Sequence, residues 1–92
     1  MIKKRKIGNT DLMISELSMG TAPIGGWPIE VSANQAYDTL DKAWSIGIRY
    51  FDTAPLYGSG MAERRLGNFL KDKNRNEFSI ATKVGRLVVN TD

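Results

Sequence analysis

The sequence predicts an α/β protein built around a parallel sheet. Short β-rich segments alternate with two stretches of helical periodicity, which is the pattern of strand–helix–strand units. Consecutive β-rich segments are spaced by about the length of one such unit, roughly 30 residues. The chain has 92 residues, of which 41% are hydrophobic and 25% charged. This composition fits one globular unit over residues 1–92 with no internal boundary.

A hairpin and a first strand are expected at the start. Residues 2–7 have β character, residues 8–11 (GNTD) are a turn cluster, and residues 12–14 can return as a second strand. Residues 16–20 (ELSMG) form another strand, and a loop with two prolines and two glycines follows over residues 21–28. The basic run KKRK at the start of the hairpin reads as a solvated surface strand rather than a nucleic-acid segment.

The clearest helix spans Ala33 to about Ile46. Ser32 and Gln35 form an S-x-x-Q capping box in front of it. Gly47 stands where a glycine commonly ends a helix. One face of the helix carries apolar residues at helical spacing: Ala36, Tyr37, Leu40, Ala43 and Trp44.

A second unit repeats this order. Residues 48–51 form a strand that ends in Asp52, a loop covers residues 53–60, and a second helix begins near Met61. Its apolar positions share one face: Ala62, Leu66, Phe69 and Leu70. A polar turn over residues 71–76 then leads into a third strand over residues 78–84.

Two architectures use such units, the open doubly wound sheet and the eight-stranded barrel. In both, active sites gather at the carboxyl ends of the strands, which here are Gly20–Thr21, residues 52–57 and Lys83. No G-x-G-x-x-G follows any of these strands, so the dinucleotide fingerprint of the open sheet is missing. Gly25-Gly26 and the glycines of residues 58–60 are interpreted as turn glycines.

Three polar residues should meet at this rim. Asp52 and Lys83 each close a predicted strand, and Tyr57 lies in the loop above Asp52. A free tyrosine has a pKa of about 10 and is a weak acid at neutral pH, but a nearby ammonium stabilises the phenolate and a carboxylate holds that ammonium charged. Such a tyrosine can give a proton to a carbonyl oxygen while hydride reaches the carbon.

Other chemistries are excluded by composition. The chain has no cysteine and no histidine, which excludes disulfides, cysteine-ligated zinc and a Ser-His-Asp triad. Neither an apolar stretch of about 20 residues nor a secretory leader is present, so we expect a cytoplasmic protein with no metal, membrane or nucleic-acid partner.

Each singled-out residue also has a plain alternative. Asp52 could cap the following loop, Tyr57 could be a half-buried loop aromatic, and Lys83 could be a surface charge. Trp27 could touch a substrate or simply cover the mouth of the site, whereas Trp44 is expected to pack its helix on the sheet.

Several motifs resemble the aldo-keto reductase family. Residues 47–58 (GIRYFDTAPLYG) are similar to the family segment around its catalytic aspartate and tyrosine, residues 63–67 (ERRLG) fit the pattern downstream, and residues 82–85 (TKVG) resemble the strand end with its catalytic lysine. The segments GNT, IS and MGTA between residues 8 and 22 match its N-terminal hairpin and first strand. The resemblance covers almost the whole chain.

The resemblance implies a role for each site residue. Asp52, Tyr57 and Lys83 would be three members of a catalytic tetrad, with Tyr57 as the general acid/base. The fourth member would be a histidine after the next strand. Thr21, Ala22 and Asp52 would line the nicotinamide–ribose end of the cofactor, NADP(H) more often than NAD(H). The substrate would be a small carbonyl compound or a sugar.

The resemblance also implies a fold: the N-terminal hairpin, the first three strands and two helices of a (β/α)8 TIM barrel, incomplete in 92 residues. The loops at residues 21–26 and 54–63 look most like the aldose (fucose or galactose) dehydrogenase and pyridoxal reductase branch. Because the barrel is incomplete, we expect the chain alone to be inactive. Two alternatives stay open, namely a cofactor-sensing regulatory subunit and a non-catalytic remnant of the same fold.

Overall fold

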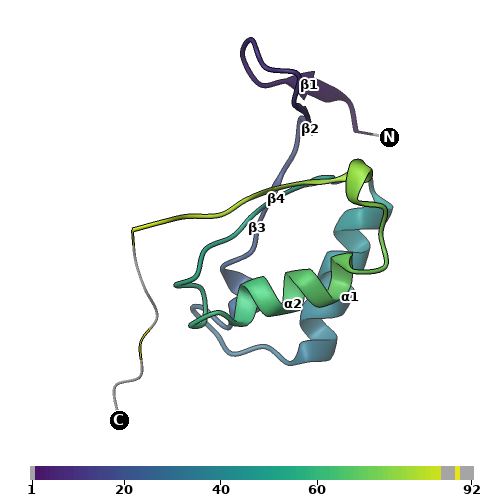
Figure 1. Ribbon diagram of the computed structural model, residues 1–92. Helices are drawn as coiled ribbons and strands as arrows, with labels where there is room; N and C mark the ends of the chain where they lie inside the picture. Colours follow the sequence, from purple (N-terminus) through teal and green to yellow (C-terminus); the bar gives the residue numbers. More distant parts are fainter. Residues whose placement is uncertain (1, 86–88, 90–92) are drawn as a thin grey trace.

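The chain opens with a small antiparallel hairpin. The computed structural model describes residues 2–85 and residue 89, and places β1 (Lys4–Lys6) against β2 (Met13–Ser15). The hairpin stands apart from the helices at one end of the molecule (Figure 1). All three residues of β1 are exposed, which confirms the expected solvated strand. Ser15 links the hairpin to the rest of the fold, because its buried hydroxyl accepts a hydrogen bond from the backbone N–H of Arg49 at 3.1 Å.

Three parallel strands form the sheet in the order β3-β4-β5. They are β3 (Met19–Gly20), β4 (Tyr50–Asp52) and β5 (Ser79–Ala81). Gly20 pairs with Asp52, and Asp52 pairs with Ala81, so the carboxyl ends of all three strands lie at one rim. This parallel arrangement confirms the predicted α/β class.

The predicted third strand was too long. It was expected to run to Val84, but β5 ends at Ala81 and Lys83 lies two residues beyond it. The pairing stops because the neighbouring strand β4 ends at Asp52. The backbone N–H of Thr53 still donates to the carbonyl of Ala81, and the loop after β4 then turns away from the sheet. The first strand is also shorter than expected, since residues 16–18 are outside β3.

Helix α1 (Ala33–Ser45) begins at the predicted capping box. The Ser32 hydroxyl accepts from the backbone N–H of Gln35 at 3.1 Å, and the Gln35 side chain accepts from the backbone N–H of Ser32 at 2.9 Å. Two donors that the first turn leaves unpaired are thereby satisfied. Gly47 follows the helix with φ 106°, the left-handed conformation expected of a glycine that ends a helix.

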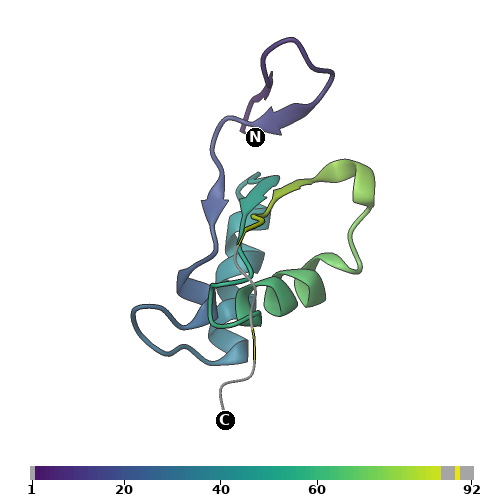
Figure 2. The same ribbon diagram turned by 60° about the vertical axis from the view of Figure 1, so that its left-hand side comes forward.

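Helix α2 (Met61–Leu70) lies beside α1, and two short 3-10 turns complete the described elements. One turn, η1 (Pro23–Gly25), lies in the loop after β3, and the other, η2 (Arg75–Glu77), precedes β5. Figure 2 shows the strands running between the hairpin at one end and the loops near the helix ends at the other.

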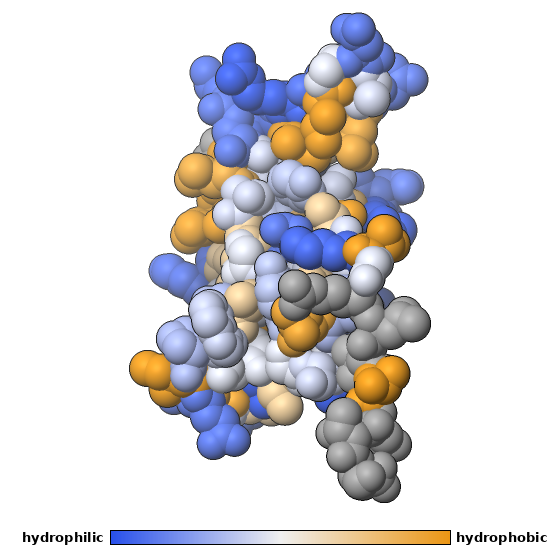
Figure 3. Space-filling view, turned by 90° about the vertical axis from the view of Figure 1, so that its left-hand side faces the viewer, coloured by the Kyte–Doolittle hydropathy of each residue, from blue (hydrophilic) through white to orange (hydrophobic). Residues whose placement is uncertain are grey.

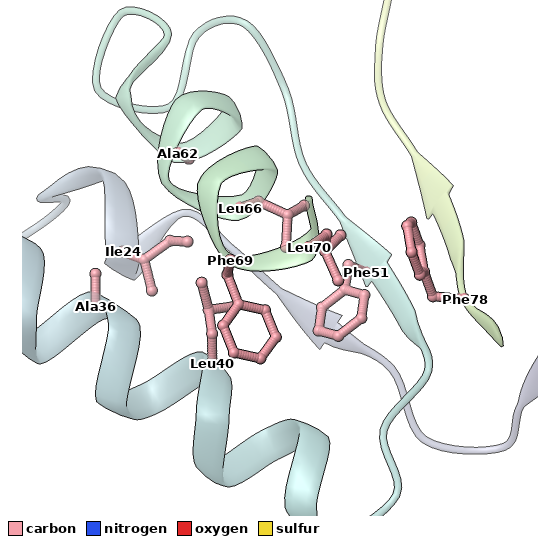
Figure 4. Close-up of a cluster of buried hydrophobic side chains, with 9 residues drawn as sticks. All are labelled: Ile24, Ala36, Leu40, Phe51, Ala62, Leu66, Phe69, Leu70 and Phe78. Atoms are coloured by element: carbon pink, nitrogen blue, oxygen red, sulfur yellow. The ribbon is translucent and has the colours of Figure 1, made fainter. Parts of the chain in front are cut away.

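The core fills the space between the two helices and the sheet (Figure 4). All four apolar positions predicted for α2 are buried, and they point toward side chains of α1, β4 and η1. The Trp44 ring stacks on Phe51 of β4 with a centroid separation of 6.5 Å, as expected for a helix residue that packs on the sheet. Tyr37 differs from the expectation: it is half exposed, although its ring makes an edge contact with Phe69 of the core.

The surface is mixed in character. In Figure 3, hydrophilic side chains gather at the hairpin end, and hydrophobic ones appear as separate groups. Among the described residues, no strand pairs with the outer edge of β3 or β5. No described helix has the length and apolarity that crossing a membrane requires.

Candidate active site

Asp52 is the last residue of β4 and stands at the carboxyl rim of the sheet. Its backbone carbonyl is fixed by Thr21, which donates to it from both its backbone N–H, at 2.9 Å, and its hydroxyl, at 3.0 Å. The Asp52 carboxylate is free of these bonds, and its side chain is 47% exposed. The strand therefore holds the backbone while the carboxylate faces the rim.

Lys83 reaches back to the same rim. Its Nζ lies 3.2 Å from Asp52 Oδ1 and donates to the carbonyl of Thr53 at 3.0 Å. The hydrogen bond to Asp52 raises the pKa of Lys83 above its ordinary value, desolvation opposes the rise, and Tyr57 adds to it. Although the strand ends early, the predicted meeting of Asp52 and Lys83 is confirmed.

Tyr57 completes the group from the loop between β4 and α2. The Lys83 Nζ lies 5.1 Å from the centre of the Tyr57 ring, a cation–π distance. The loop is tightly turned, since the Tyr57 backbone N–H donates to Ala54 and its carbonyl accepts from Ala62. A carboxylate, an ammonium and a phenol thus converge at one rim.

Two glycines let the loops around Tyr57 approach each other. Gly58 has φ 65°, and a Cβ there would overlap the carbonyl of Gly25. A Cβ on Gly25 would in turn stand 2.9 Å from the Tyr57 carbonyl oxygen. These are turn and packing glycines, as interpreted from the sequence.

Two hollows border the Tyr57 ring. One, of about 360 Å³, is lined by the segment from Ala54 to Tyr57 together with Lys83 and Val84. The lining of the other, of about 480 Å³, includes Ala22 and Trp27. Tyr57 and Leu56 line both, so Tyr57 borders one hollow that Lys83 also lines and another that Trp27 also lines.

The expected cofactor-lining residues fall into two groups. Asp52 and Ala22 are partly exposed at the rim. Thr21 is fully buried, with its hydroxyl bonded to the Asp52 carbonyl, so its side chain serves the pairing of β3 with β4. The catalytic and cofactor roles of all these residues stay predictions.

The surroundings of Asp52, Lys83, Tyr57 and Trp27 bear on the plain alternatives for these residues. The Asp52 carboxylate pairs with Lys83, and Lys83 is not an isolated surface charge. Tyr57 is half buried, as the alternative had it, but it also lies beside the ammonium. Trp27 is 69% exposed at the second hollow.

Three residues around the site were missed. Arg65 donates from Nη1 to the carbonyls of Ile24, at 2.8 Å, and Val31, at 3.0 Å, and so fastens the loop after β3 to α2. The Thr82 hydroxyl donates to Glu63 Oε2 at 2.7 Å. Helical periodicity gives no signal for either interaction, because each joins side chains from α2 to a segment far away in the sequence.

Comparison with known proteins decides the family. The model of the aldo/keto reductase family matches residues 16–92. The chain belongs to this family. Aldo-keto reductases are oxidoreductases of aldehydes and sugars and use nicotinamide cofactors.

Relatives of this aldo-keto reductase chain are similar over nearly all of it. Pyridoxal 4-dehydrogenase of Microbacterium luteolum is 47% identical over 88 residues, covering 96% of this chain and 25% of that protein. D-threo-aldose 1-dehydrogenase of a Pseudomonas species is 48% identical over 77 residues, covering 84% of this chain and 23% of that protein. The chain therefore spans about a quarter of the length of these relatives.

A solved structure agrees with the fold. The holo form of an aldo-keto reductase from Bacillus halodurans superposes with a TM-score of 0.81 at 38% identity, covering 92% of this chain and 26% of that one. The described hairpin, three strands and two helices are thus part of a (β/α)8 barrel, and the barrel is incomplete in this chain. The barrel, rather than the doubly wound sheet, is confirmed.

Proposed function

We propose that this chain carries the proton-transfer site of an NAD(P)(H)-dependent oxidoreductase that interconverts aldehydes or ketones and alcohols, or aldose sugars and lactones. The observation that supports it most is the Asp52–Lys83 pair, 3.2 Å apart, with the Lys83 ammonium against Tyr57. We assign Tyr57 as the general acid/base.

The pair gives Tyr57 its proposed chemistry. Asp52 keeps Lys83 charged, and the Thr53 carbonyl takes a second N–H of the ammonium, which fixes its direction. An ammonium beside the ring stabilises the negative charge that develops on the phenolic oxygen. In reduction, Tyr57 gives its hydroxyl proton to the carbonyl oxygen; in oxidation, the phenolate takes the proton from the alcohol.

The rim residues fit one end of a nicotinamide nucleotide. The half-exposed Asp52 carboxylate can accept a hydrogen bond from a ribose hydroxyl, and Gly20 beside it leaves open space, with nothing within 4 Å of where a Cβ would stand. When bound, the nicotinamide supplies or accepts the hydride. We assign Asp52 and Ala22 to direct contacts and Thr21 to holding the Asp52 backbone, and NADP(H) as the favoured nucleotide.

The substrate is proposed to be a small sugar or a ring-bearing aldehyde. The second hollow has the exposed Trp27 indole as a wall beside Tyr57. An aromatic wall suits the apolar face of a sugar ring or a planar heterocycle. The names of the two curated relatives, a pyridoxal and a D-threo-aldose dehydrogenase, support the same choice.

A chimera tests the assignment. This chain would replace the matching segment of the Microbacterium luteolum pyridoxal 4-dehydrogenase, so that the relative supplies the remainder of the barrel. We expect nicotinamide-dependent oxidation of pyridoxal, and Tyr57→Phe in the chimera should lower kcat by about 100- to 10,000-fold, the usual range for loss of a general acid/base. The chain without the remainder is the baseline, and we expect it to show no steady oxidation of NADPH with a reactive aldehyde.

The matched control is Tyr50→Phe, which removes a phenol hydroxyl from β4 that makes no hydrogen bond to another described residue. It should stay within about threefold of the parent chimera, since surface or unbonded groups contribute little. A Tyr57→Phe chimera that turns over as fast as the Tyr50→Phe one would remove Tyr57 from the mechanism.

A further inference from the structure

Lys83 starts from a segment that no strand holds. The last residue of β5 is Ala81, and residues 82–85 make no backbone–backbone hydrogen bond to another described residue. Lysine carries a long, flexible side chain, so holding its ammonium at a fixed point requires that its backbone be fixed first. We propose that Glu63 and Thr82 form a tether that positions Lys83 against Asp52; its importance for catalysis rests on the function proposed above.

The tether is a single short hydrogen bond. The Thr82 hydroxyl donates to Glu63 Oε2 at 2.7 Å, across 19 residues of sequence. Hydroxyl-to-carboxylate bonds of this length are among the stronger hydrogen bonds in proteins. Because Thr82 immediately precedes Lys83, fixing its side chain also fixes the point from which the lysine departs.

Helix α2 is a suitable anchor. Glu63 lies in its first turn, where the helix dipole favours a negative charge. The N-cap residue is Gly60, which has no side chain to bond, and the carboxylate turns toward Thr82. Glu63 lies next to Ala62, which is fully buried, so packing of the helix on the core holds the backbone of Glu63 in place.

Glu63 acts through position rather than charge. The groups that raise the pKa of Lys83 are Asp52 and Tyr57, and the ion pair found for this lysine among the described residues is with Asp52. Among the described residues, Glu63 bonds to Thr82 and not to Lys83, so we assign its effect on the ammonium to the position of Thr82. This distinction separates a positioning residue from a second counter-ion, and it can be measured.

Competitive acetylation of the 92-residue chain tests the tether. Acetic anhydride at limiting concentration and mildly alkaline pH modifies only neutral amines, and peptide mass spectrometry gives the labelling of Lys83 relative to Lys71, an exposed lysine after α2. Thr82→Val removes the hydroxyl and keeps the shape. We expect it to raise Lys83 labelling by about two- to tenfold, because an ammonium that loses part of its bond to Asp52 has a lower pKa and is neutral more often. Asp52→Asn sets the upper limit.

Conservative variants give the rescue. Thr82→Ser keeps the donor and Glu63→Gln keeps an acceptor oxygen, so both should label as the parent does. Glu63→Ala should match Thr82→Val, and the double variant should equal either single one, because both remove the same bond. If Glu63→Gln instead labels as Glu63→Ala does, or if the two single effects add, the tether is wrong.

Two features keep the test decisive. Thr82→Val and Glu63→Ala break the bond from opposite ends, so either one suffices if circular dichroism shows that the other has lost its helices. Unchanged labelling in a folded variant overturns the proposal. Labelling needs neither cofactor nor substrate, so the tether can fail while Tyr57 turnover in the chimera succeeds, and the reverse.

Discussion

Tyr57 and Lys83 lie beside each other at the rim of the sheet, but the chain holds them by different means. Tyr57 is held through the backbone: its carbonyl and N–H are bonded within the turn, and Gly25 and Gly58 bring two loops into direct contact beside it. Lys83 is held through side chains, by its own bonds to the rim and by the contact of Thr82 with Glu63.

The difference has a physical consequence. A backbone-built position is rigid, because changing it requires changes in dihedral angles that packing opposes. A position built from side chains on a half-exposed rim is adjustable, because each bond competes with water and screening. Tyr57, the proposed proton donor, thus lies on the stiffer support, while the position of the Lys83 ammonium can adjust.

The largest effect on stability is expected at the backbone contact between Gly58 and Gly25 beside Tyr57. Gly58→Ala would strain the left-handed φ of 65° and press a methyl group into the Gly25 carbonyl. A left-handed non-glycine residue costs about 1–2 kcal/mol, and the overlap adds to it, so we expect a loss of about 3 kcal/mol in the free energy of unfolding. Urea denaturation followed by circular dichroism measures it.

Gly8→Ala is the matched control for that variant. Gly8 also has a left-handed φ, of 53°, but nothing lies within 4 Å of where its Cβ would stand. Strain alone should then cost about 1 kcal/mol. Equal losses at the two glycines would show that the loop contact beside Tyr57 contributes nothing.

A smaller effect is expected at Arg65, which fastens the loop after β3 to α2. Arg65→Met removes the donor to the Ile24 and Val31 carbonyls while keeping much of the apolar stem. A bond from a charged donor contributes about 1.5–3 kcal/mol, and since the side chain is partly exposed we expect a loss near 1.5 kcal/mol in the same assay. Arg64→Met is the control: Arg64 is exposed and should change stability by less than about 0.5 kcal/mol. Equal losses would mean that the hydrogen bonds of Arg65 to the loop after β3 do not stabilise the fold.

The same contrast explains what the sequence could predict. The capping box at Ser32, the glycine after α1 and the buried face of α2 follow from patterns within a few residues, and the structure confirms them. The meeting of Asp52 with Lys83 follows from strand order, because parallel strands end at one rim.

Other features were beyond such reasoning. The early end of β5 depends on where the chain after Asp52 leaves the sheet, and no local pattern near Ala81 records it. The burial of Thr21 and its bond to the Asp52 carbonyl depend on the register of β3 with β4. Both require knowledge of which residues lie opposite each other.

The smallest effect is expected at the Asp52–Lys83 pair, and it is a dependence of stability on pH. The pKa of Lys83 is raised in the folded state, chiefly by its bond to Asp52. A raised lysine stabilises the fold at pH values below its unfolded pKa of 10.5, and this contribution disappears as the pH rises through the folded value. The parent chain should therefore lose more stability than Asp52→Asn when the urea midpoint is followed from neutral pH into the range above 10.5. Asp72→Asn, which alters an exposed carboxylate away from the site, should follow the parent curve. Parallel curves for the parent and Asp52→Asn would mean that the pair contributes no stability, and that Lys83 is held at the rim by the Thr53 carbonyl and the Glu63–Thr82 tether alone.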